Sequence, residues 1–318
     1  MMRARDALAM LLAASALAAA TASTWSAWTD AGGSVAGTIS AVADWQAPPV
    51  DAAVAGKSSG GSTGFVHQGG GYYVYANVTD AGNPASGTSA VSADAGSIST
   101  GLSAVPLSAG SFSAQGVAYN RRSALLTANA TLAEGSRATT IATTDVAANS
   151  AVVSGPSVVV DNAAPSAVAV QIDNGGLIAG RPDSGDTMAL DWSETLDPYS
   201  ILAGWSGAAA AVQVVITDVS ATDSITIQSS GGVALPLGTI ALNSQYVTAT
   251  STFSATMVQS GASIVVTLGA MITGIPHTAN KKATLTWGAG TVTGATDRAA
   301  NALVDSTITE SGIADLDF

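Results

Sequence analysis

The sequence predicts an all-β protein whose chain forms two β-sandwich modules in tandem. The first observation is composition: only 10% of the residues are charged and 34 are glycine, while alanine, valine, serine and threonine are abundant. Small and β-branched residues favour strands and tight turns over helices. The second is length, because 318 residues accommodate a short leader and two domains of roughly 100 to 150 residues each. The third is an alternation of apolar and polar side chains, which is typical of half-buried strands.

The first residues have the pattern of a secretory signal peptide. Arg3 and Arg5 form a basic region, residues 7–20 are apolar, and residues 20–22 read Ala-Thr-Ala, as at a small-residue cleavage site. The apolar run is shorter than the roughly 20 residues that a membrane span needs. We therefore expect residues 1–22 to be a cleaved signal peptide and the exported protein to have no membrane span. Residues 23–47 are expected to form a linker or extended segment.

The first sandwich is expected over residues 48–163. Pro48 and Pro49 remove two backbone donors and hold the chain extended at its start. Residues 72–78 alternate in polarity as a strand does, and the Asp-Ala-Gly-Asn-Pro sequence at 80–84 predicts a turn. Further strands are expected over residues 111–119, 123–132, 138–144 and 157–160.

A second, larger sandwich is expected over residues 164–318. The segment 161–165, Asp-Asn-Ala-Ala-Pro, marks the boundary because its polar pair can bond local backbone and its proline ends the preceding strand. A short helix is expected over residues 197–205, where Asp197 is a candidate N-cap ahead of Pro198. Strands are expected over residues 188–192, 212–217, 224–228, 263–268 and 283–287.

Several segments resemble those of known secreted proteins. Segment 161–165 resembles the joint between tandem bacterial immunoglobulin-like modules, and the tryptophan-rich residues 25–49 resemble the region after the leader in actinobacterial proteins with a SipW-dependent type of signal peptide. Residues 165–318 resemble a module of uncharacterised secreted actinobacterial proteins, through Trp192-Ser193-Glu194 and the Asp-Pro-Tyr-Ser-Ile-Leu-Ala-Gly-Trp-Ser-Gly run at 197–207. These resemblances imply export and tandem immunoglobulin-like β-sandwiches, and they bring no activity.

An internal repeat supports two modules. The Thr-Asp-x-Ala-Ala-Asn sequence at 144–149 recurs at 296–301. It is similar to a Thr-Asp-x-Ala-Gly-Asn turn that precedes the final strand of many bacterial immunoglobulin-like modules, with Ala148 and Ala300 in place of the glycine. Alanine makes a backbone with positive φ less expected there, although the flanking Asp and Asn suit a turn that bonds its own backbone.

Charge and cysteine content exclude several classes of function. The net charge is −12, from 22 acidic and 10 basic residues, so the chain has few cations to neutralise a run of phosphates and nucleic acid is not expected as a partner. The absence of cysteine excludes disulfides, thiolate nucleophiles and cysteine metal sites. Stability must come from packing and hydrogen bonds.

Calcium is the ligand that the residue types favour. Oxygen-rich turns near the joint between sandwiches can surround a hard cation. The candidate ligands are Asp145, Asn149, Asp161 and Asn162, with Asp297 and Asn301 as their equivalents in the second module. The alternative is that these residues form ordinary Asx turns without a metal.

No catalytic residues are assigned. His67 and His277 lie in different predicted modules, and no nucleophile motif accompanies them. Asp191, Glu194 and Asp197 are close in sequence but nothing marks a glycosidase cleft. Of the aromatic residues, Trp205 is a candidate for stacking on a sugar ring, whereas the position of Trp192 on the apolar face of a strand favours the core.

The sequence therefore predicts a secreted, non-catalytic structural or adhesive protein of the bacterial cell surface or extracellular matrix. Its partners would be a protein or glycan at the cell surface, or further copies of the chain, because strands rich in Thr and Val and poor in Lys can pair at their edges. A secreted carbohydrate-binding module and a secreted hydrolase remain the alternatives.

Overall fold

The computed structural model describes residues 44–80, 82, 84–279, 281–289 and 294–318, together with the backbone of β1 (Trp28–Asp30) and β2 (Gly33–Val35), which pair with each other. The predicted signal peptide, 1–22, and most of the predicted linker, 23–47, lie outside the described residues. The fold is all-β, as predicted, and the described residues contain one short helix, α2 (Pro198–Ile201). None of their helices is long and apolar enough to cross a membrane.

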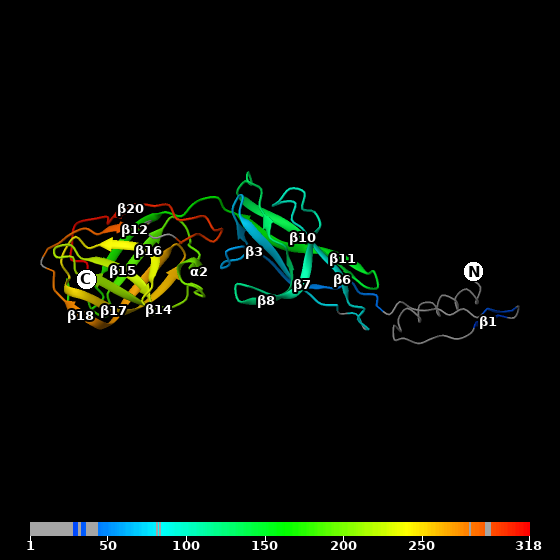
Figure 1. Ribbon diagram of the computed structural model, residues 1–318, viewed down its shortest axis with the longest axis horizontal. Helices are drawn as coiled ribbons and strands as arrows, with labels where there is room; N and C mark the ends of the chain where they lie inside the picture. Colours follow the sequence, from blue (N-terminus) through cyan, green and yellow to red (C-terminus); the bar gives the residue numbers. More distant parts are fainter. Residues whose placement is uncertain are drawn as a thin grey trace, which may run out of the picture.

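Two sheets build two modules that lie end to end (Figure 1). We call residues 44–160 the N-module and residues 161–318 the C-module. The strands of the N-module are β3 (Val50–Lys57), β4 (Phe65–Val66), β5 (Gly71–Val78), β6 (Thr88–Asp94), β7 (Val105–Ala114), β8 (Val117–Ser123), β9 (Leu126–Thr127), β10 (Gly135–Asp145) and β11 (Ser150–Val160). Their order is β3-β5-β8-β7-β6-β10-β11-β4, with β9 beside β5.

Strand β7 joins the two layers of the N-module. Val105 and Pro106 pair with β6, whereas residues 107–114 pair with β8. The core-facing residues predicted within 72–78 are confirmed in β5, where Tyr72, Val74, Ala76 and Val78 are buried, although Tyr75, between them, is buried as well. These side chains join residues such as Ile98, Ile141 and Val158 in one apolar core.

The C-module is a larger sheet that curls on itself. Its strands are β12 (Ala167–Asp173), β13 (Thr187–Trp192), β14 (Ala210–Thr217), β15 (Ser224–Ser229), β16 (Ala234–Ala241), β17 (Val247–Ser260), β18 (Ser263–Pro276), β19 (Thr286–Gly288) and β20 (Thr307–Thr309). Their order is β12-β13-β18-β17-β14-β15-β16-β19-β20, and the two end strands, β12 and β20, contact each other. Trp192 and Trp287 meet edge to face in its core, with ring centroids 4.7 Å apart.

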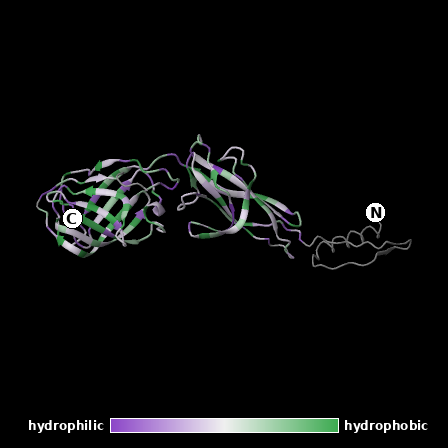
Figure 2. Cartoon of the chain, viewed as in Figure 1, coloured by the Kyte–Doolittle hydropathy of each residue, from purple (hydrophilic) through white to green (hydrophobic). Residues whose placement is uncertain are grey.

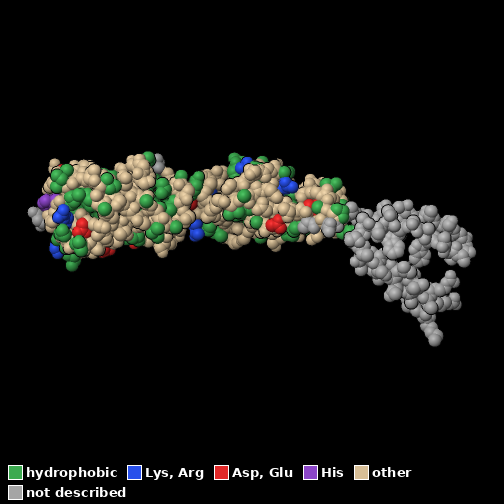
Figure 3. Space-filling view, turned by 90° about the horizontal axis from the view of Figure 1, so that it is seen from below, with side chains coloured by type: hydrophobic (Ala, Val, Ile, Leu, Met, Phe, Trp, Pro, Cys, Tyr) green, Lys and Arg blue, Asp and Glu red, His purple; other side chains and the backbone are tan. Residues whose placement is uncertain are grey.

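Side-chain character follows this architecture. Hydrophobic and polar residues alternate along the strands, most visibly in the C-module (Figure 2). On the face shown in Figure 3, charged side chains are few and scattered over both modules. The face therefore offers no broad charged patch.

Three predicted strands and the predicted helix need correction. Of the strand predicted over residues 283–287, only residues 286 and 287 lie in a strand, β19. Residues 111–119 are not one strand but the β7–β8 hairpin, because Gln115 and Gly116 have φ of 48° and 78° and reverse the chain. Apart from Ser123, which ends β8, residues 123–132 contain only the two-residue strand β9. The helix predicted over residues 197–205 spans only α2, which Asp197 caps as expected by accepting a hydrogen bond from the Tyr199 N–H.

Candidate cation sites and the junction between the modules

Each module begins and ends in the same way. The chain leads into the N-module with Asp44-Trp45-Gln46-Ala47-Pro48 and into the C-module with residues 161–165, so both leading segments read Asp-x-x-Ala-Pro. In each module the asparagine of the repeated turn holds this segment. The Asn149 amide donates to the Asp44 carbonyl oxygen at 3.0 Å, and the Asn301 amide donates to that of Asp161 at 2.9 Å. The repeat is therefore structural as well as sequential.

The repeated turns have nearly identical hydrogen bonds. Asp145 accepts from the backbone N–H and the side-chain amide of Asn149, both at 2.7 Å. Asp297 accepts from the same groups of Asn301 at 2.7 and 2.8 Å. The turns that the sequence predicts to bond their own backbone are thus present in both modules.

Ala148 and Ala300 introduce backbone strain into these turns. Their φ angles are 67° and 76°, a left-handed conformation that costs an L-residue with a Cβ about 1 to 2 kcal/mol. We expect Ala300→Gly to raise the free energy of unfolding by about 0.5 to 1 kcal/mol, because relief of this strain outweighs the greater freedom of glycine in the unfolded chain. Urea unfolding measures the change. Ala299→Gly, next to it but without positive φ, is the control and should destabilise.

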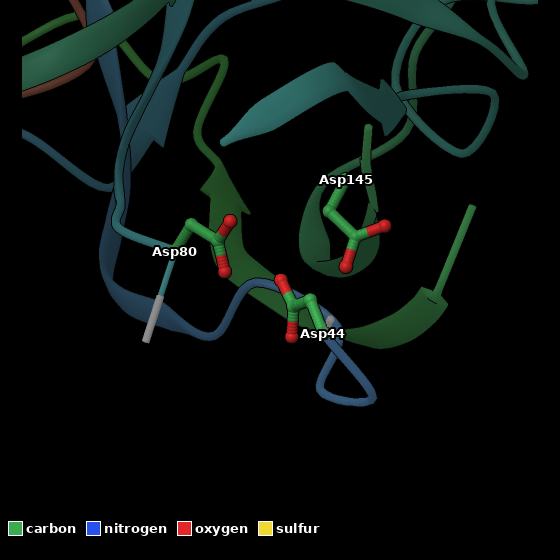
Figure 4. Close-up of side chains that lie close together, drawn as sticks. All are labelled: Asp44, Asp80 and Asp145. Atoms are coloured by element: carbon green, nitrogen blue, oxygen red, sulfur yellow. The ribbon is translucent and has the colours of Figure 1, made fainter. Parts of the chain in front are cut away.

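Three carboxylates converge where the N-module begins (Figure 4). Asp44 comes from the leading segment, Asp80 follows β5, and Asp145 ends β10; we call them the N-cluster. Each offers an oxygen within 4.8 Å of those of the other two. The backbone N–H groups of Gln46 and Ser86 donate to Asp44 and lower the pKa of its carboxyl group. Asp44 is therefore fixed in place as a carboxylate.

A matching set of acids lies where the C-module begins. Asp161 of the leading segment, Glu194 after β13 and Asp297 of the repeated turn form the junction cluster, with oxygens again within 4.8 Å of one another. Burial, followed by the charges of Asp161 and Asp297, raises the pKa of Glu194 to about 7. Burial also raises the pKa of Asp297, although Asn301 donates to it. These three acids therefore repel one another near neutral pH.

The structure does not bring the four predicted metal ligands together at the joint, because Asp145 and Asn149 lie where the N-module begins. Asp145 and Asp161 belong to separate clusters, and Asn149 and Asn301 use their amide groups to hold the leading segments. Asn162 belongs to neither cluster, because it accepts from Gln68 and donates to the Leu132 carbonyl oxygen. Oxygens on opposite sides of Ca²⁺ lie about 5 Å apart. Each cluster thus has the donor type and the spacing that could hold such a cation.

A buried ion pair joins the modules beside the junction cluster. The Lys57 ammonium at the end of β3 lies 2.6 Å from the Asp197 carboxylate, and their side chains are only 3% and 2% exposed. Lys57 also donates to the Asp297 carbonyl oxygen at 3.0 Å. Water is excluded from this ion pair only while the two modules are in contact. Separating the modules would therefore expose both charges to water.

Three further contacts surround this ion pair. The Ser62 hydroxyl and backbone N–H donate to Asp197 at 3.0 and 3.3 Å. The Arg298 guanidinium lies over the Phe65 ring, 4.3 Å from its centroid. Gly61 has a φ of 79°, and a Cβ there would lie 2.1 Å from Asp197 Oδ2, so the modules approach each other too closely for a side chain at this position.

A cleft of about 690 Å³ lies along the same junction. Residues from both modules line it, among them Lys57, Gln115, Tyr199 and Trp205. Trp205, the candidate for sugar stacking, is only 7% exposed and its indole N–H donates to the Ala208 carbonyl oxygen. Its ring packs in the apolar core of the C-module and offers little surface to a sugar.

The residues considered for catalysis are not brought together. His67 lies in the N-module and His277 in the C-module, where its Nδ1 is 3.4 Å from the Gln245 carbonyl oxygen. Glu194 faces the other acids of the junction cluster, whereas Asp197 pairs with Lys57. Three partners were not predicted from the sequence: Asp44 and Asp80, which meet Asp145, and Lys57, which meets Asp197. The alternation of apolar and polar residues does not show which side chains meet across the fold. The repeated Asp-x-x-Ala-Pro sequence was the one available signal, since it pairs Asp44 with Asp161.

A comparison of the chain with known protein families finds no match, and a search of curated proteins finds no relative.

Proposed function

We propose that this chain is an exported, non-catalytic structural or adhesive protein of the bacterial cell surface or extracellular matrix, in which two sandwich modules form a stiff spacer. The buried contact between Lys57 and Asp197 is the observation that carries the proposal. Modules joined by a short linker and a small polar interface ordinarily move relative to each other. Here a change in their angle would separate a buried ion pair, which restrains the motion.

Calcium at the junction cluster is the second part of the proposal. Asp161 belongs to the linker, whereas Glu194 and Asp297 belong to the body of the C-module, so one cation would tie the linker to the module. It would also remove the repulsion among three acids, one of which, Glu194, has its pKa raised to about 7. The support is that the same arrangement of acids occurs at the equivalent place in the N-module.

Self-association through a strand edge is the third part. On the side away from β10, β11 pairs with β4 only through Val159 and Val160. Residues 146–160 carry no charge, and Val152 is 72% exposed. Pro156, which has no N–H to donate, fits a strand at an edge. An uncharged edge of this kind can pair with a strand of another copy.

Spin labels on the two modules test these proposals. The chain has no cysteine, so Leu125→Cys and Leu177→Cys, at exposed sites of the N-module and C-module, can be labelled selectively. With calcium at pH 7.5 we expect one narrow distribution of distances between the labels, because the junction is rigid. Chelation should broaden the distribution, since the acids of the junction cluster then repel. Light scattering on the same samples should show mass above that of a monomer at high concentration.

The controls separate the three parts. Glu194→Gln should make the distribution of label distances insensitive to chelation. With Asp80→Asn, in the N-cluster, the distribution should still broaden on chelation. A broad distribution with and without calcium would contradict the stiff spacer. A monomer at every concentration would exclude self-association and leave the spacer proposal intact.

A further inference from the structure

A third group of acids lies at the end of the C-module that is remote from the N-module. Glu310 follows β20, and Asp315 and Asp317 belong to the segment that follows it; we call them the tail cluster. Figure 1 marks the end of the chain at this pole of the C-module. Each of the three acids offers a carboxylate oxygen within 4.8 Å of those of the other two. None of the three was predicted from the sequence to be a metal ligand.

Hydrogen bonds hold two of these acids firmly. One oxygen of Asp317, Oδ2, accepts from the Tyr246 hydroxyl at 2.6 Å, and the Asp317 N–H donates back to that hydroxyl at 3.0 Å. One oxygen of Glu310, Oε2, accepts from the Leu285 N–H at 3.1 Å. Phe318 packs edge to face on the Tyr246 ring, with centroids 5.0 Å apart. These contacts hold residues 310–318 in place without a ligand.

The second oxygen of each of these two acids has no partner. Glu310 Oε1 and Asp317 Oδ1 are buried and accept no hydrogen bond from the described residues. The exposed fraction is 7% for Glu310 and zero for Asp317. Buried carboxylate oxygens are normally satisfied by a donor or a cation. Two unsatisfied oxygens in one acidic group indicate that a ligand belongs there.

The surrounding charges specify the sign of that ligand. The charges that act most strongly on Asp317 are those of Glu310 and Asp315, and those on Glu310 are Asp315 and Asp173. All of them are negative. The ligand is therefore a cation or a proton.

We infer that the tail cluster binds a divalent cation of the calcium class, held by Glu310, Asp315 and Asp317. Ca²⁺ takes oxygen ligands at about 2.3 to 2.6 Å, so a separation of up to 4.8 Å between ligand oxygens suits it. The exposed side chain of Asp315 leaves a path for the ion and for water that completes its coordination. The cation would clamp the segment 310–318 against the strands that hold Tyr246 and Leu285.

Calcium titration of a chain without the other two clusters tests the inference. In a chain that carries both Asp80→Asn and Glu194→Gln, the N-cluster and the junction cluster each lack one acid. Of the three clusters, only the tail cluster then keeps all its acids. Isothermal titration with CaCl₂ at pH 7.5 should give about one bound ion, and saturating calcium should raise the Tm by about 5 to 10 °C. Adding Asp315→Asn should abolish both effects. Because Asp315 is exposed, this substitution leaves the core unchanged.

Asp305→Asn, at an exposed acid outside the cluster, is the matched control and should keep the bound ion and the rise in Tm. No bound calcium and no change of Tm in the doubly substituted chain would overturn the inference, and the acids would then share a proton. Binding that survives Asp315→Asn would overturn it as well. Neither outcome bears on the distances between the spin labels, so failure here is distinct from failure of the stiff spacer.

Discussion

Replacing Lys57 by methionine is expected to open the junction between the modules. The substitution keeps most of the side chain's volume but leaves the Asp197 carboxylate buried without its cation, at a cost of about 3 to 5 kcal/mol while the modules stay docked. Ser62 and the α2 backbone still donate to Asp197, but they do not neutralise its charge. Separation of the modules returns the carboxylate to water. The distances between labels at positions 125 and 177 should therefore spread over a wide range.

Two variants make this result specific. Lys282→Met removes an exposed lysine of the C-module and should leave the distribution narrow. Combining Lys57→Met with Asp197→Asn removes both charges and keeps a side-chain oxygen for capping α2, so it should restore much of the narrow distribution. If Lys57→Met alone leaves the distances unchanged, the ion pair does not hold the modules.

Trp192→Ala is expected to lower the free energy of unfolding by about 3 to 5 kcal/mol, because it removes a large side chain from the centre of the C-module core. Trp192 is 4% exposed and meets Trp287 edge to face. Urea unfolding, followed by circular dichroism, measures the loss. This outcome would place Trp192 in the core, as the apolar face of its strand predicts.

Phenylalanine substitutions at the two tryptophans provide an internal comparison. Trp192 Nε1 is buried without a hydrogen-bond partner among the described residues, whereas Trp287 Nε1 donates to the Leu237 carbonyl oxygen at 2.8 Å. Trp192→Phe removes an unsatisfied donor, but Trp287→Phe leaves a buried carbonyl without its donor. We expect Trp287→Phe to cost more.

The sequence predicts strands well where one face is buried and poorly where the chain reverses. The core residues of β5 occupy every second position from Tyr72 to Val78, so their period is visible without the structure. The β7–β8 hairpin was missed although Gly116 is a turn residue, because its partner Gln115 takes positive φ without being glycine, asparagine or aspartate.

The candidate sites were predictable only in part. Asp145 and Asp297 stand in a repeated sequence, which reveals that they are equivalent. Their neighbours Asp80 and Glu194 follow the strands β5 and β13, far away in the sequence, and only sheet pairing brings them close. The pairing of Lys57 with Asp197 depends on how two separately folded modules dock, and no local pattern encodes that.

The closeness of the modules also governs how the chain would respond to a pulling force. The linker between β11 and β12 comprises residues 161–166, which extend to only roughly 20 Å. If tension breaks the Lys57 contact, the molecule therefore lengthens very little before the load reaches the strands. Unravelling residues 50–160 would release about 370 Å of chain. The contact between the modules thus determines how stiff the molecule is at low force. Nearly all of its possible extension requires the folded sheets to unravel.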